Sequence, residues 1–274
     1  MDTHSFPSTT KAGFTSTCRM PGAMRRNTSD CFDGSMTSRS TSSHPGERSR
    51  RSCRKRQVQG NCHKSVLHAI MMTAAIPVVL MPTRNHYGII GPIEHEAFQF
   101  ENIQQKIDAN PFATGKRSPP RILTLTQSTY DGILYNVEAI KQMLDRRIDT
   151  LHFDEAWLPH ASFHELYASM HAIGHGRPRC RDSMVFSTQS THKLLAGLSQ
   201  ASQILVQESD SQRLDRECFN EAFLMHTSTS PQYAIIASCD VAASTMEPPT
   251  GTALVEEAIM EALDFRRAMR KASL

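Results

Sequence analysis

Isoleucine, leucine and valine are almost absent from the first 60 residues and frequent in everything that follows. Residues 1–60 hold one of them, Val58, together with 19 serines and threonines. A segment this poor in branched apolar residues cannot bury enough surface to offset the entropy of ordering its chain. The sequence therefore predicts two parts, a disordered basic Ser/Thr/Arg-rich segment at residues 1–59 and a folded domain at residues 60–274.

Charge divides at the same place. Residues 1–60 carry 11 Lys and Arg against 4 Asp and Glu, a surplus of +7, while the rest of the chain stands at −4 within a total of +3. The basic run at residues 48–56 could tether nucleic acid, but no aromatic residues interleave it as a single-strand platform requires. A solvated tail is the simpler interpretation, so we expect no nucleic-acid partner.

The composition excludes several classes of protein. The longest apolar stretch, residues 69–81, is interrupted by Thr73 and Pro77 and falls short of the ~18 residues of a membrane span. Residues 1–7 have neither the cationic start nor the apolar run of a secretory signal, which favours a cytoplasmic protein. The seven cysteines form no C-x-x-C pair and the 13 histidines are scattered, so we expect free thiols and no metal site.

Short apolar runs alternate with helical patterns after residue 60. Strands are predicted at residues 76–81, 121–126, 150–153, 184–188 and 201–207, and helices at 62–73, 136–147, 210–226, 234–246 and 252–271, with a short helix or turn at 193–202. Asn61 is the expected N-cap of the first helix. This alternation predicts an α/β fold with a mostly parallel sheet flanked by helices on both faces.

Residues 187–202 carry the most chemical information. Lys193 follows an apolar strand, with Ser190 and His192 before it and small residues after it. A lysine in such a place can form a Schiff base with an aldehyde cofactor, while a hydroxyl and an imidazole donate to the cofactor's phosphate. The small residues would let the backbone approach. Taken alone, such a string is more often a solvated loop.

Read as a whole, residues 190–202 resemble the pyridoxal-phosphate attachment site of the bacterial ornithine/lysine/arginine decarboxylase family: Ser-x-His-Lys, then small residues and Ser-Gln-Ala-Ser. Further blocks at residues 60–65, 82–91, 128–136, 152–157 and 225–231 are similar to the same family in the same order. The resemblance covers about residues 60–272. Residues 88–93 and 153–157 look most like the arginine-acting branch.

The resemblance implies part of the large domain of a pyridoxal-phosphate-dependent transferase with the aspartate-aminotransferase-like fold. It gives Lys193 the role of carrying the cofactor and Asp154 that of holding the proton on the cofactor's ring nitrogen. Ala156 and His63 would lie on opposite faces of the ring. Without the resemblance, His63 is more simply a helix-terminal or core histidine, and Asp154 a capping or salt-bridged acid.

The resemblance also implies contacts to the phosphate and to a second subunit. Ser190 and His192 would bind the phosphate, and a loop containing Thr229 would reach the phosphate of a neighbouring subunit. A homodimer or higher homo-oligomer is therefore expected. Glu155 and Trp157 are assigned to packing and local polarity, because strand alternation would point them away from the cofactor.

The implied function is pyridoxal-phosphate-dependent decarboxylation of arginine, lysine or ornithine to its amine through a Schiff base on Lys193, with His63 or Lys193 returning the proton. The alternative is a catalytically inactive, truncated remnant of such an enzyme. The resemblance begins inside the cofactor domain and lacks the upstream turn that cradles the phosphate. Residues 14–17 end 46 residues before His63, too far to supply it. Residues 1–59 resemble an out-of-frame translation of that missing region.

Overall fold

A computed structural model describes residues 55–60, 62–113, 119–174 and 176–272 of the chain. The backbone forms two units: one is Pro45–Gln212 with Ser230–Leu274, and the other includes Arg213–Thr229. The predicted disordered segment up to residue 54, with residues 14–17 in it, lies outside the described residues. Of the helices that the structure describes, none combines the length and the apolar character needed to cross a bilayer.

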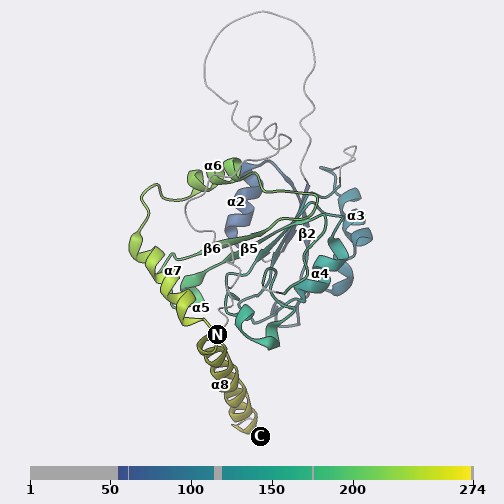
Figure 1. The fold of residues 1–274 in the computed structure, drawn as a ribbon. Coiled ribbons are helices and arrows are strands. Elements are labelled where there is room, and N and C mark those ends of the chain that lie inside the picture. Colours follow the sequence, from purple (N-terminus) through teal and green to yellow (C-terminus); the bar gives the residue numbers. More distant parts are fainter. Residues whose placement is uncertain (1–54, 61, 114–118, 175, 273–274) are drawn as a thin grey trace, which may run out of the picture. The chain divides into compact units, whose positions relative to one another are not determined.

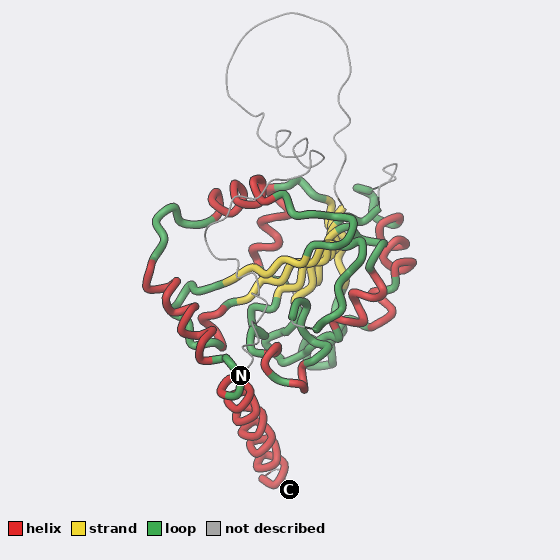
Figure 2. The backbone as a smooth tube through the Cα atoms, in the orientation of Figure 1, coloured by secondary structure: helices red, strands yellow, loops and turns green. Residues whose placement is uncertain are grey.

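One sheet organises the larger unit, and Figure 2 shows its strands as a single twisted layer. The strands are β1 (Lys55–Gln59), β2 (Ile76–Leu80), β3 (Ile122–Thr126), β4 (Thr150–Asp154), β5 (Met184–Gln189) and β6 (Gln203–Gln207). Their order is β2-β1-β3-β4-β5-β6, with every pair parallel except β5 and β6. The predicted α/β class with a mostly parallel sheet is confirmed.

Strand β1 corrects the predicted domain boundary. Residues 55–59 were assigned to the disordered segment, yet they pair with β2 along their whole length and with β3 through Arg56, Gln57 and Val58. That assignment was wrong for these five residues, because composition measures side chains whereas a central strand is held on both sides by its backbone. The folded part therefore begins at or before Lys55.

The helices follow the strands as parallel connections require. They are α2 (Lys64–Met72), α3 (Phe100–Asp108), α4 (Val137–Leu144), α5 (Thr191–Leu194), α7 (Tyr233–Thr245) and α8 (Thr250–Ala272), with 3₁₀ turns η2 (His95–Phe98), η3 (Ala161–Phe163) and η4 (Glu165–Tyr167). The chain moves in one direction across the sheet from β1 to β2, and in the opposite direction from β2 to β3 and from β3 to β4. Right-handed crossovers then place α2 on one face and α3 and α4 on the other (Figure 1).

The main core lies on the face covered by α3 and α4. In β2 the alternation buries Ile76, Val78 and Leu80 and leaves the residues between them exposed. The core also contains Leu123, Leu125, Leu151, Phe153 and Val185 from the sheet and Ile103, Ile107, Val137, Ile140 and Leu144 from the two helices. By contrast, α2 has no buried residue. The face bearing α2 is therefore the less covered one.

Helices α7 and α8 belong to the same unit and pack on the turn that follows α5. Leu195, just after α5, is buried with Ala242 and Met246 from the end of α7 and Val255 from α8. A hydrogen bond of 2.9 Å from the Leu198 backbone N–H to the Ser238 hydroxyl adds to this contact. The turn that carries Lys193 is therefore held from behind by the carboxyl-terminal helices.

The smaller unit contributes α6 (Arg216–His226). The Asp215 carboxylate caps the helix by accepting a 2.8 Å hydrogen bond from the Cys218 backbone N–H. This cap explains why the helix begins six residues later than the start of the predicted 210–226 segment. Thr229, in the loop after α6, is exposed and belongs to this unit.

Candidate active site

Parallel strands end side by side at one edge of the sheet, and the residues singled out from the sequence follow two of them. Asp154, the last residue of β4, is opposite Thr126 at the end of β3 and Thr188 in β5. The chain then continues from β5 into α5, which contains His192 and Lys193. The fold therefore brings this carboxylate and this amine to one edge of the sheet.

Asp154 is half-buried and combines a local contact with a longer-range one. Its Oδ1 accepts a hydrogen bond of 3.2 Å from the backbone N–H of Ala156, which is also half-buried. Burial raises the pKa of the Cys62 thiol above its usual value, a backbone hydrogen bond lowers it, and the Asp154 charge raises it further. Since α2 begins shortly after the carboxyl end of β1, its amino end follows the same edge of the parallel sheet as Asp154.

His63 is exposed and forms the N-cap of α2. Its Nδ1 accepts from the Ser65 backbone N–H at 3.3 Å and lies 2.8 Å from the Ser65 hydroxyl oxygen. A neutral ring in this arrangement carries its proton on Nε2. His63 is therefore a helix-terminal histidine, as its residue type alone suggested, and Asn61, the expected cap, lies outside the described residues.

Lys193 lies against an aromatic ring. Its Nζ is 4.4 Å from the centroid of the Trp157 ring, a cation–π geometry. On its other contact, the Trp157 ring packs against Tyr130: the two ring centroids are 5.0 Å apart in a T-shaped arrangement. The interpretation that Trp157 points away from the site was wrong. Strand β4 ends at Asp154, so its alternation does not extend three residues further.

Sequence reasoning missed both aromatic residues as parts of this edge. Tyr130 belongs to the loop after β3, and Trp157 to the loop after β4. Each follows the carboxyl end of a predicted parallel strand, and ligand sites in such sheets gather at these ends. That position was the available signal. Trp157 is also the chain's single tryptophan, which makes it a natural spectroscopic reporter for Lys193.

The turn around Lys193 is compact and internally bonded. Both the backbone N–H and the ring Nδ1 of His192 contact the carbonyl oxygen of Ala201, at 3.1 and 2.7 Å. A Cβ at Gly197 would lie 3.0 Å from the Ala201 Cβ and 3.2 Å from the Thr191 carbonyl carbon. The glycine thus allows the turn to close on itself. With Nδ1 donating to Ala201, the His192 Nε2 donates a hydrogen bond only in the protonated ring.

Other polar groups in this region remain available to a ligand. Ser190 precedes α5 as its N-cap, but its side chain makes no capping bond within the described residues. The buried hydroxyls of Thr191, next in the chain, and Ser128, just after β3, have no hydrogen-bond partner among those residues. An amine, a carboxylate and free hydroxyls fit an aldehyde cofactor that also bears a ring nitrogen and a phosphate.

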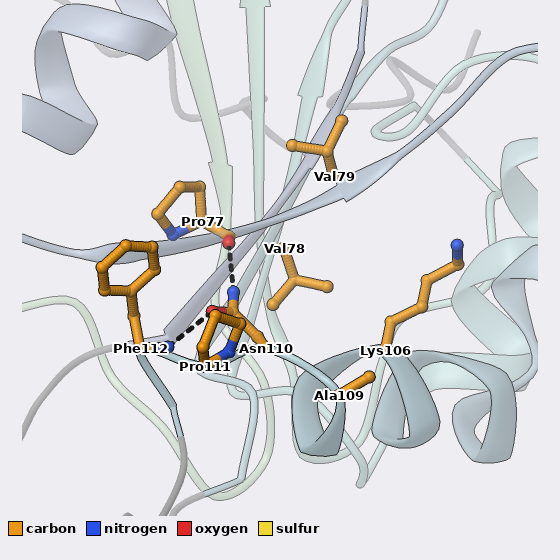
Figure 3. Close-up of a pocket in the computed structure, with 8 residues that line it drawn as sticks. All are labelled: Pro77, Val78, Val79, Lys106, Ala109, Asn110, Pro111 and Phe112. Carbon is orange, nitrogen blue, oxygen red and sulfur yellow. Dashed lines mark hydrogen bonds between the residues drawn. The ribbon is translucent and has the colours of Figure 1, made fainter.

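Two hollows in the larger unit lie apart from Asp154. One, of about 510 Å³, lies beside the edge strand β2 (Figure 3). There Asn110 donates to the Pro77 carbonyl oxygen and accepts from the Phe112 N–H, each at 3.0 Å. Since Pro77 is near the amino end of β2, this hollow is not at the carboxyl edge. The other, of about 240 Å³, is lined by Leu195, His160 and residues of α7 and α8, behind the Lys193 turn.

The structure thus gathers most of the candidate residues but not all of them. Five of them lie in β4, in α5 or in adjoining residues at the carboxyl edge, namely Asp154, Ala156, Ser190, His192 and Lys193. His63 follows the carboxyl end of β1 at the same edge. Thr229 belongs to the other unit and is described only with it.

The sheet and this edge define a protein of the pyridoxal-phosphate-dependent transferase fold. Mouse CSAD, a solved structure, is similar with a TM-score of 0.53 and 14% identity over 79% of this chain and 44% of its own, a likeness in fold alone. The chain belongs to the Orn/Lys/Arg decarboxylase family, whose major domain matches residues 54–274. Members of this family are pyridoxal-phosphate-dependent decarboxylases of basic amino acids.

Relatives within the family are considerably more similar. Lysine decarboxylase LdcA of Pseudomonas aeruginosa is 52% identical over 212 residues, 77% of this chain and 28% of the relative. Its solved structure matches with a TM-score of 0.73 over 79% of this chain and 29% of its own. The biodegradative arginine decarboxylase of Escherichia coli is 45% identical over 78% of this chain and 28% of its own length. The chain therefore spans less than a third of each of these relatives.

Proposed function

We propose that this chain provides the cofactor-bearing segment of a decarboxylase acting on a basic amino acid. The observation that carries the proposal is the placement of Asp154 and Lys193 at one edge of the sheet, with β4 and β5 paired in register up to that edge. Membership of the Orn/Lys/Arg decarboxylase family supports the reaction type.

Pyridoxal phosphate, when bound, supplies an electron sink for the electron pair left as carbon dioxide departs from the substrate. The chain's own residues would hold and orient it. Lys193 would attach it through Nζ, and Asp154 would keep a proton on its ring nitrogen through a charge-assisted hydrogen bond. Ala156 and His63 would lie against the ring, with His63 or Lys193 holding the proton that returns to the substrate carbon.

The phosphate would be held by Ser190 and His192, and by Thr229 acting on a neighbouring copy, which makes a homodimer or higher homo-oligomer part of the proposal. Within this set, the Ser190 side chain makes no capping bond among the described residues, whereas the His192 Nδ1 already donates to Ala201. His192 would therefore contribute to the phosphate as an imidazolium.

The substrate is proposed as lysine, arginine or ornithine. The sequence alone leaned towards the arginine-acting branch, but the 52% identity with a lysine decarboxylase exceeds the 45% identity with an arginine decarboxylase. We therefore place lysine first among the substrates to be tried and retain the other two. An inactive remnant of such an enzyme is retained as the second candidate.

Visible absorbance after addition of pyridoxal phosphate tests the first step, the attachment of the cofactor to Lys193. The full chain should develop a band that Lys193→Ala abolishes, while the matched variant Lys106→Ala, on α3, retains it. Release of carbon dioxide from lysine, arginine or ornithine then assigns the substrate. A lysine-dependent band without carbon dioxide release supports the remnant, and no Lys193-dependent band rejects the cofactor role itself.

A further inference from the structure

Glu155 is a fully buried acid next to Asp154, and its carboxylate accepts hydrogen bonds from three donors. Its side chain is 0% exposed. One carboxylate oxygen accepts the Ala172 backbone N–H at 2.5 Å. The other accepts the Ser187 hydroxyl at 2.6 Å and the Gln189 side-chain amide at 3.0 Å. A buried carboxylate with this many donors is far more costly to disturb than an exposed one.

Two of these donors belong to the last residues of β5. In addition, the Glu155 backbone N–H donates to the Thr188 carbonyl oxygen at 2.8 Å. Glu155 is therefore bonded to three consecutive residues of β5, Ser187, Thr188 and Gln189. The Gln189 side-chain oxygen in turn accepts from Gln203 of β6 at 2.7 Å, which carries the connection to the next strand.

Lys193 comes four residues after Gln189, inside the short helix α5, whose far end is held by the contacts of His192 with Ala201 and by the packing of Leu195 on α7 and α8. Helix α5 has four residues, and the Ser190 side chain makes no capping bond within the described part of the chain. The near end of α5 is therefore held by β5, so the position of the Lys193 amine against Trp157 depends in part on where β5 ends. Glu155 sets that end and is itself two residues from Trp157.

We propose that Glu155 is the positioning residue that fixes Lys193 beside Trp157 and near Asp154. The inference rests on the proposed cofactor role of Lys193. Glu155 lies outside the reaction itself. Its carboxylate determines where the end of β5 lies, and β5 leads directly into α5, which carries Lys193 at the carboxyl edge of the sheet.

The chain offers a matched control at the other end of the same strand. The Asp145 carboxylate accepts the backbone N–H groups of Arg181, Asp182 and Ser183 at 2.8, 3.0 and 2.9 Å, just before β5 begins. Like Glu155, it accepts hydrogen bonds from several donors next to one end of β5; it also accepts the backbone N–H of Arg146 at 3.1 Å. Asp145→Asn therefore removes comparable bonds without touching the end that leads to Lys193.

The first experiment measures the Lys193–Trp157 contact without any cofactor, in a double-mutant cycle. A charged amine beside the indole ring alters its emission, so Lys193→Met should change the fluorescence of the single tryptophan in the unmodified chain. The effect of Lys193→Met on the emission should be unchanged in the Asp145→Asn background. In the Glu155→Gln background it should be at least threefold smaller. An equal effect of Lys193→Met in the Glu155→Gln background overturns the proposal.

Ser187→Ala is the milder second variant, in case Glu155→Gln does not fold. It removes one donor and should reduce the effect of Lys193→Met on the emission by about half, since Gln189 and Ala172 still bind the carboxylate. An unreduced effect in Ser187→Ala also counts against the proposal.

The second readout separates this proposal from the proposed function. After reaction with pyridoxal phosphate and borohydride, mass spectrometry gives the labelling of Lys193 relative to the exposed Lys106 of α3. This ratio should fall at least fivefold in Glu155→Gln and stay constant in Asp145→Asn. If the unmodified chain shows no selective labelling of Lys193, the proposed function fails, and the emission cycle still decides the role of Glu155.

Discussion

The side chains of Lys141 and Glu155 both form hydrogen bonds to the backbone of Ala172, one to its carbonyl oxygen and the other to its N–H. The Lys141 amine donates to the Ala172 carbonyl oxygen at 2.9 Å, and the Glu155 carboxylate accepts the Ala172 N–H at 2.5 Å. All three residues are buried. A base from α4 and an acid from the end of β4 thus hold one peptide segment between them. The charge of each offsets part of the cost of burying the other.

Replacing Lys141 by methionine should therefore be strongly destabilising. The change keeps the length of the side chain but removes its bonds to Ala172, Pro178 and Gln207, and it leaves Glu155 without this nearby positive charge. Leaving buried acceptors without their donor costs about 1–3 kcal/mol, and more where a charged group is involved. Urea unfolding of Lys141→Met should show a loss in this range, whereas the exposed control Lys106→Met should lose less than about 0.5 kcal/mol.

Removal of the Asp154 charge should accelerate alkylation of Cys62. That charge raises the pKa of the thiol, although burial is the larger cause. In Asp154→Asn the thiolate fraction at a given pH should therefore rise, and with it the reaction rate with iodoacetamide. Peptide mapping measures the rate at Cys62. Asp108→Asn, on α3, serves as the control, and equal rates in the two variants would show that Cys62 and Asp154 are not neighbours.

Cys180 should make the folded chain less stable at alkaline pH. Burial raises the pKa of its thiol from 9.0 to about 11, with smaller opposing effects of Lys141 and Asp145. Because the folded-state value is the higher one, the contribution is complete below pH 9, and it is lost as the pH rises towards about 11. The free energy of unfolding between these limits should fall less steeply in Cys180→Ala. Parallel curves for the two proteins would refute the assignment.

A methyl group at Gly197 should disturb the Lys193 turn. The added Cβ would press on the Thr191 backbone, which cannot rotate away as a side chain can. We expect Gly197→Ala to cost about 1–3 kcal/mol and to shift the Trp157 emission. Its neighbour gives the opposite control: Ala196 has a φ of +23°, so Ala196→Gly should leave stability unchanged or slightly higher. A neutral Gly197→Ala contradicts the close packing described for this turn.

Local signals in the sequence predicted most of the sheet and the edge that bears the candidate site. β3, β4 and β5 contain apolar runs with branched residues. The three predicted strands at these places lie within about one residue of the observed ones at either end. Asp154 could be placed because it directly follows the predicted strand at 150–153, and Lys193 because it comes a few residues after the predicted strand at 184–188. Their proposed roles, by contrast, came from the family resemblance.

The remaining features depend on contacts between distant segments. β1 has a charged and polar sequence that gives no strand signal, and it is defined by its backbone pairing with β2 and β3. The contact between Trp157 and Lys193 depends on where β4 stops. The role of Glu155 depends on Ala172, Ser187 and Gln189, which only the folded chain brings around it.

The position of β1 has a practical consequence for anyone who shortens this chain. Composition alone recommends a cut at Gly60, which would look like the removal of a dispensable tail. In the strand order β2-β1-β3, that cut removes an interior strand, and β2 and β3 would be left about two strand spacings, or ~9.5 Å, apart. A usable expression boundary therefore has to fall upstream of Lys55.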